Sequence, residues 1–201
     1  MINCIIFDIG NVILDFYPLD YLKNLFTDST PQEILELHRD IFESEEWLKL
    51  DRGVISQQQA VETLAIRNPK LKDKIQKAME TWVEILTPKE DVIKILKKLD
   101  SKKYKLLLLS NFHEDAYAHI IDKYEFFQLF QGGIISYKEK LLKPEEEIYL
   151  SLIKKYNISP IEAIFIDDTV VNIDGANRLG FNTIQFRNAK QLQCELNNYI
   201  S

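Results

Sequence analysis

Residues 4–12 read CIIFDIGNV, a short apolar run that ends in an acidic residue and is followed by a glycine two positions later. An unbroken run of β-branched and aromatic residues predicts a strand buried on both faces of a parallel sheet. Runs of the same character recur along the chain: Cys4–Phe7, Lys105–Leu109, Gly133–Ile135, Ala163–Ile166 and Thr183–Phe186. Helix-length segments separate them, with amphipathic helices expected at Lys89–Leu99 and Glu145–Tyr156. The sequence therefore predicts an α/β fold with a doubly wound parallel sheet.

Residues 16–86 contain no comparable strand and have several helical stretches in its place. The stretches Gln32–Leu50, Ser56–Ile66 and Leu71–Leu86 carry apolar residues at helical spacing, and Ile34, Leu37, Ile41 and Leu48 are expected to face a common core. We expect Trp47 and Trp82 to lie in the same core. The pattern predicts a helical cap, residues 16–86, inserted into a core formed by residues 1–15 and 87–201.

The composition and net charge of the chain exclude some classes of binding partner. The chain has 201 residues, 46% of them apolar and 28% charged, which is typical of a globular protein. A net charge of −6 opposes general binding to nucleic acid. The first residues form neither a signal peptide nor a membrane span, so we expect a cytoplasmic protein without a membrane partner.

Polar residues follow the predicted strands where each one ends. Asp8 follows the first run, Ser110 and Asn111 the second, and Asp167 and Asp168 the fourth, while Lys143 precedes Pro144 at a loop-to-helix junction. Ligands of open parallel sheets bind at the carboxyl ends of the strands, so these groups are expected in one crevice. Carboxylates from two strands can hold Mg²⁺, and hydroxyl, amide and ammonium groups can neutralise a phosphoryl group. The set predicts phosphoryl transfer, in which a carboxylate can also attack phosphorus.

In these residues the sequence resembles the haloacid dehalogenase-like hydrolase superfamily, in its phosphatase branch with a helical cap after the first strand. The resemblance lies in four motifs: Ile5-Ile6-Phe7-Asp8-Ile9-Gly10-Asn11-Val12, Leu109-Ser110-Asn111, Lys143-Pro144 and Phe165-Ile166-Asp167-Asp168. It implies that Asp8 is the nucleophile, that Lys143 orients it, and that Ser110 and Asn111 bind the phosphoryl group. It also implies Mg²⁺ held by Asp8, the Gly10 carbonyl, Asp167 and Asp168, with Asn172 bracing the fourth loop.

Gly10 departs from the family pattern, because most phosphatases of this superfamily have there an aspartate that protonates the leaving group. General acid–base help of this kind is worth about 10²–10⁴-fold in rate. The Asp-x-Gly-Asn-Val pattern resembles a subgroup with bacterial α-glucose-1-phosphate phosphatases, which suggests a sugar phosphate such as glucose 1-phosphate as substrate. Two alternatives stay open: a 2-haloacid dehalogenase-type hydrolase, and a non-catalytic protein that binds a phosphometabolite.

Four further residues are candidates for contact with the substrate. Asn11 belongs to the first motif, and His113 follows Asn111 closely enough to reach the crevice mouth. Asp51 and Arg52 lie in a predicted break between cap helices, where a cap can reach over the site. The expected partner is a small-molecule phosphate ester, and the sequence favours neither a monomer nor a homodimer.

Overall fold

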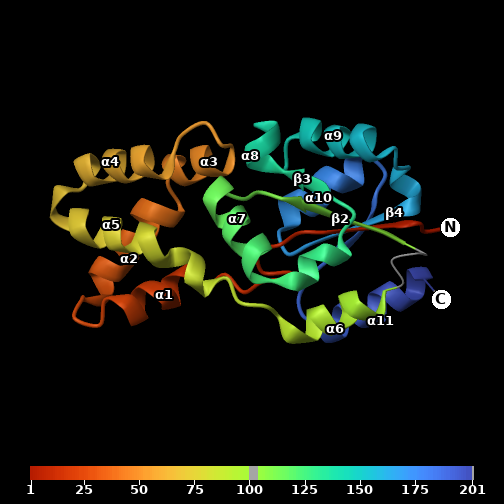
Figure 1. The fold of residues 1–201 in the computed structure, drawn as a ribbon, viewed down its shortest axis with the longest axis horizontal. Coiled ribbons are helices and arrows are strands. Elements are labelled where there is room, and N and C mark those ends of the chain that lie inside the picture. The colour runs from red at the N-terminus through yellow and green to blue at the C-terminus, as the bar shows by residue number, and fades with distance from the viewer. Residues whose placement is uncertain (100–103, 201) are drawn as a thin grey trace.

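A five-stranded parallel sheet forms the centre of the computed structural model, which describes residues 1–99 and 104–200 (Figure 1). Residues 100–103 and 201, part of the predicted core, lie outside the described residues. The strands are β1 (Cys4–Phe7), β2 (Lys105–Ser110), β3 (Gly133–Ile135), β4 (Ala163–Asp167) and β5 (Asn182–Gln185), in the spatial order β3-β2-β1-β4-β5. All four pairings are parallel. The predicted fold class is confirmed, and β1 lies in the middle of the sheet.

Helices cover both faces of the sheet, as Figure 1 shows. One face packs on α6 (Glu90–Lys98), α7 (Glu114–Lys123) and α11 (Ala189–Ile200), and the other on α9 (Glu146–Tyr156) and α10 (Val170–Arg178). The side chains of β1 alternate between the two apolar clusters, with Phe7 in the first and Ile6 in the second. Both sides of the central strands β1 and β4 are therefore buried, which explains their unbroken apolar runs, whereas β5 at the edge of the sheet is mostly half-buried. Among the described residues no helix has the length and apolar character needed to cross a membrane.

Residues 16–86 form the helical part at the left of Figure 1, comprising α1 (Pro18–Leu25), α2 (Pro31–Phe42), α3 (Glu45–Asp51), α4 (Gln57–Arg67) and α5 (Lys72–Thr81). They have their own buried cluster, which includes Leu22, Leu37 and Ile75. The two segments that join this part to the sheet run side by side, because Asp15 N donates to Thr87 O at 2.8 Å and Lys89 N to Ile13 O at 2.9 Å. The exact division into cap and core stays a prediction.

The expected helix Gln32–Leu50 is two helices. Ser44 separates α2 from α3: its hydroxyl donates to Ile41 O at 2.7 Å and accepts from Trp47 N at 3.1 Å, so it caps α3. This break changes the helical phase, and Leu48 is 54% exposed where we expected a core residue. Ile34, Leu37 and Ile41, which precede the break, are buried as predicted.

The start of β3 depends on a residue without a side chain. A Cβ atom at Gly133 would lie 2.4 Å from the carbonyl oxygen and 2.7 Å from the nitrogen of Leu108 in the neighbouring strand. Because those atoms are backbone, the clash cannot be relieved by a rotamer change. Gly133→Ala should lower the free energy of unfolding by about 1–3 kcal/mol or more, as overpacking does. Gly10→Ala is the matched control, since a Cβ there meets nothing within 4 Å. Urea unfolding curves would contradict the prediction if both variants were equally stable.

Candidate active site

Three carboxylates meet at the carboxyl end of the sheet. Asp8 follows β1, Asp167 ends β4 and Asp168 comes next, and the register pairs Phe7 with Ile166, so the two strands end together. One carboxylate oxygen from each residue lies within 4.8 Å of the other two. Clustered carboxylate oxygens of this kind are the ligands that Mg²⁺ takes in proteins. Gly10 lines the same pocket as Asp8, where its carbonyl was expected to contribute.

Lys143 lies beneath this cluster and joins two of its members. Its Nζ is 2.8 Å from Asp8 Oδ1 and 2.6 Å from Asp167 Oδ2, and its side chain is 2% exposed. Burial works against its charge, but attraction by Asp167 and Asp8 outweighs it and raises the pKa of Lys143. Burial also raises the pKa of Asp8 to about 7, with Lys143 opposing the rise and Asp167 adding to it. The lysine is a fixed positive charge beside the expected nucleophile.

Asp167 and Asp168 differ in how they are held. The Asp167 carboxylate accepts from Lys143 Nζ, from Thr169 N at 2.8 Å and from Asn172 Nδ2 at 3.1 Å, and it is fully buried. Asp168 is partly exposed, and burial followed by repulsion from Asp167 raises its pKa. Asn172 thus lies where it was expected to brace the loop. Asp168 is the carboxylate with more of its surface open to a cation.

Ser110 and Asn111, the two residues expected to bind phosphate, have different hydrogen-bond partners. Ser110 ends β2 and is buried, and its hydroxyl hydrogen-bonds to Asp8. Asn111 is engaged with the lysine loop: Lys143 N donates to Asn111 Oδ1 at 2.8 Å, and Asn111 Nδ2 donates to Lys143 O at 3.1 Å. Its amide therefore fixes the position of Lys143, a contact that strand-end spacing did not indicate.

Two of the expected substrate contacts are engaged elsewhere. Asn11 has φ of 55°, and its Oδ1 accepts from Phe16 N at 3.1 Å, so it closes the turn that follows β1. The Arg52 guanidinium pairs with Glu145 in a bidentate ion pair and donates to Lys140 O at 3.0 Å. Asn11 therefore shapes the loop, and Arg52 joins the α3 end of the helical part to the loop before α9. A contact of either residue with the substrate stays a prediction.

Asp51 and His113 come together, although 62 positions separate them in the sequence. Asp51 Oδ1 lies 3.3 Å from His113 Nε2, and the side chains are 13% and 5% exposed. Neither ring nitrogen of His113 makes a well-formed hydrogen bond to the described residues, and burial lowers the pKa of His113 to about 3. Burial raises the pKa of Asp51 to about 8, with Lys143 opposing and Asp8 adding to the rise. His113, which we expected to reach the mouth of the crevice, is buried and neutral beside Asp51.

These two residues line a cavity of about 120 Å³ beside Gly10. Its other walls are Phe16, Trp47, Trp82, Leu86, Asn111 and Phe112. The ring centroids of Trp47 and Trp82 are 4.2 and 5.1 Å from that of His113. Trp47 packs against the buried cluster of the helical part, as expected, and also against the sheet-side cluster, to which Trp82 belongs. The two tryptophans therefore lie where the helical part meets the sheet. A second pocket, lined by Asp8, Ser110, Lys143 and Asn172, shares Gly10 and Asn111 with this cavity.

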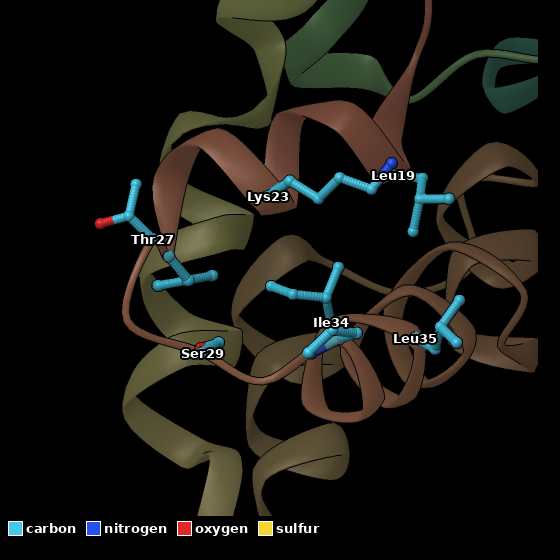
Figure 2. A pocket seen from close by; sticks show the side chains of 8 residues that line it. Leu19, Lys23, Thr27, Ser29, Ile34 and Leu35 are labelled. Carbon is cyan, nitrogen blue, oxygen red and sulfur yellow. The ribbon is translucent and has the colours of Figure 1, made fainter.

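A further pocket of about 300 Å³ lies at the far end of the helical part (Figure 2). Leu19 and Lys23 of α1 face Ile34 and Leu35 of α2 across it, and Thr27 and Ser29 lie in the connecting loop. No carboxylate is among the described residues that line it, so it offers neither a carboxylate nucleophile nor a carboxylate ligand for a metal ion.

Comparisons with known proteins agree with this geometry. A sesquiterpene phosphatase of Aspergillus oryzae is 24% identical over 179 residues, which cover 87% of this chain and 85% of that protein. A HAD family enzyme of Bacteroides thetaiotaomicron, solved with magnesium and inorganic phosphate, has a TM-score of 0.72 at 24% identity over 93% of this chain and 95% of the other. The L-2-haloacid dehalogenase of Xanthobacter autotrophicus has a TM-score of 0.69 at 19% identity, covering 100% and 84%. These structures share the fold with this chain.

A family model also matches the sequence itself. The haloacid dehalogenase-like hydrolase model covers residues 2–180, which include the carboxylate cluster, Lys143 and the helical part. The chain therefore belongs to the haloacid dehalogenase-like hydrolase family.

Proposed function

We propose that this protein is a Mg²⁺-dependent phosphatase that hydrolyses a small phosphate monoester through an aspartyl-phosphate on Asp8. The observation that carries the proposal is the Asp8 carboxylate held 2.8 Å from Lys143 Nζ, with Asp167 and Asp168 close enough to share a cation. Asp8 is the one carboxylate among residues lining the pocket that also contains Ser110 and Lys143. Its oxygen not paired with lysine is the natural nucleophile.

The surrounding side chains have distinct roles in this reaction. Lys143 holds the Asp8 carboxylate in one orientation and favours its ionised form. Ser110, hydrogen-bonded to Asp8, is near enough to bind an oxygen of the transferring group. Asp8, Asp167 and Asp168 would hold Mg²⁺, which supplies positive charge for the phosphoryl oxygens and lowers the pKa of nearby acids. The sesquiterpene phosphatase relative and the structural neighbour with magnesium and phosphate support this assignment.

The lining of the cavity beside Gly10 indicates which kind of alcohol portion the ester has. Resemblance to the glucose-1-phosphate subgroup suggests a sugar, but five of the lining side chains are apolar or aromatic and the polar ones are Asp51, Asn111 and His113. A sugar would bring several hydroxyls, and each hydroxyl buried without a partner costs about 1–3 kcal/mol. A compact apolar or aromatic alcohol portion fits this lining better.

The nucleophile is tested by Asp8→Asn, which keeps the side-chain shape. Phosphate release should fall by more than about 10³-fold, because an amide cannot form the acyl phosphate. Asp28→Asn, an exposed change in the helical part, is the control and should retain full activity. Mass spectrometry of acid-quenched wild-type enzyme should detect one phosphate on the peptide that contains Asp8. An active Asp8→Asn enzyme would refute the mechanism.

The requirement for Mg²⁺ is tested by removing the ion and by weakening its proposed binding site. EDTA should stop phosphate release and excess Mg²⁺ restore it, and Asp168→Asn should raise the Mg²⁺ concentration for half-maximal rate by about tenfold or more. Halide release from 2-haloacids with full activity in EDTA would favour the dehalogenase instead. Saturable phosphate-ester binding without turnover would favour a non-catalytic binding protein.

The alcohol preference is tested with a matched pair of esters. Benzyl phosphate should exceed glucose 1-phosphate in kcat/KM by about tenfold or more, the value of one unpaired buried polar group. Trp47→Ala should reduce this ratio, because the indole lines the cavity. A higher kcat/KM for glucose 1-phosphate would restore the sugar phosphate as the better prediction.

A further inference from the structure

Gly10 leaves open space where a proton donor is needed. A Cβ atom built on Gly10 would meet no heavy atom within 4 Å, so the backbone there faces the cavity and not a packed neighbour. Gly10 and Asn111 line both the pocket around Asp8 and the cavity beside the tryptophans. A phosphoryl group bound at Asp8 with its alcohol portion in the cavity therefore has its bridging oxygen near Gly10. Of the described residues that line the cavity, Asp51 is the one with a carboxyl group.

The helical part holds Asp51 in a fixed place against the sheet. Ser136 Oγ, in the first residue of the short helix α8 (Ser136–Glu139) that follows β3, donates to the Asp51 carbonyl at 2.5 Å. Arg52 is paired with Glu145, and Lys140 Nζ donates to the carbonyl of Gly53. Each of the consecutive residues 51–53 thus makes a hydrogen bond or an ion pair with a residue in the segment 136–145, which follows β3. A side chain fixed in this way can serve a reaction that occurs on the other part of the molecule.

We propose that Asp51 is the proton donor and acceptor of this enzyme, supplied by the helical part in place of a carboxyl at position 10, and that His113 positions it. The inference rests on the proposed phosphatase function. In the first step Asp8 attacks phosphorus, the bond from phosphorus to the alcohol oxygen breaks, and the Asp51 carboxyl gives its proton to that oxygen. In the second step the Asp51 carboxylate takes a proton from the water that attacks the phosphoaspartate. The bond from phosphorus to Asp8 then breaks, releasing phosphate and restoring both carboxyl groups.

The surroundings favour a carboxyl group that can change its protonation. Within residues 1–99 and 104–200, three titratable groups face Asp51: His113 at the start of α7, Asp8 after β1 and Lys143 before α9. His113 is buried and neutral, so it places no permanent charge beside Asp51, while Asp8 and Lys143 carry opposite charges. Burial favours the neutral acid, the form that must be present when the ester binds. The His113 ring borders the carboxyl, with Nε2 at 3.3 Å from Asp51 Oδ1, and so limits where that group can lie.

Two esters of similar shape test this role in the full-length enzyme with Mg²⁺. 4-Nitrophenyl phosphate releases a weakly basic phenolate, whereas benzyl phosphate releases a strongly basic alkoxide that needs a proton. Under single-turnover conditions, Asp51→Asn should slow benzyl phosphate cleavage by about 10²–10⁴-fold and 4-nitrophenyl phosphate cleavage by less than about tenfold. His113→Gln should show the same selectivity with smaller losses, and Asp28→Asn should leave both rates unchanged.

If Asp51→Asn slowed the cleavage of both esters equally, Asp51 would have only a structural role. If it slowed neither, Asp51 would have no role in the reaction. Each result would overturn the proposal. Wild-type enzyme that cleaves neither ester would overturn the phosphatase function and this inference together, so the two failures are distinguishable.

A gain-of-function variant provides a second test if Asp51→Asn does not fold. In the otherwise unchanged chain, Gly10→Asp places a carboxyl in open space beside the same oxygen. If Asp51 already donates the proton, benzyl phosphate cleavage should rise by less than about tenfold. A rise of about 10²-fold or more would show that no donor was in place, and would overturn the proposal.

Discussion

The buried ammonium group of Lys143 is the interaction on which the site depends. Asp8 follows β1 and Asp167 ends the neighbouring β4, and sheet register alone would bring the two buried carboxylates together. Like charges this close repel, and removing one partner from a buried ion pair costs about 3–5 kcal/mol. Lys143 compensates both carboxylates at 2.8 and 2.6 Å. The same contacts that make the strand ends compatible also orient Asp8, the proposed nucleophile.

The position of Lys143 depends in turn on backbone hydrogen bonds. Asn111, at the end of β2, binds the backbone nitrogen and carbonyl of Lys143. Asn172 and Thr169 hold the second carboxylate from α10 and its preceding loop. The three central strands therefore contribute to one network, and a change at any member would alter the orientation of Asp8. Residues that hold Lys143 and Asp167 in this way can act on the chemistry through the orientation of Asp8.

The helical part closes the other side of the site, next to Gly10. Its α3 end is tied to the segment between β3 and α9 by Ser136, Arg52 and Lys140. These bonds bring Trp47 and Asp51 over Gly10 and enclose a cavity that is mostly aromatic. The apolar wall lowers the local dielectric, which strengthens electrostatic interactions inside and favours the neutral form of Asp51. One arrangement thus supports both the alcohol preference and the proposed proton transfer.

The sequence by itself determined the sheet, its parallel order of strand and helix, and the identity of the residues at the strand ends. These features follow from local periodicity and from the rule that ligands bind where parallel strands end, so Asp8, Ser110, Asp167 and Asp168 could be named without coordinates. Only the tertiary structure decided the partners of the side chains. The Ser44 break reversed the expectation for Leu48, and Asn11 and Arg52 proved to be engaged in a turn and an ion pair. The meeting of Asp51 with His113 depends on contacts between segments far apart in the chain, and such contacts leave no periodic signal in a single sequence.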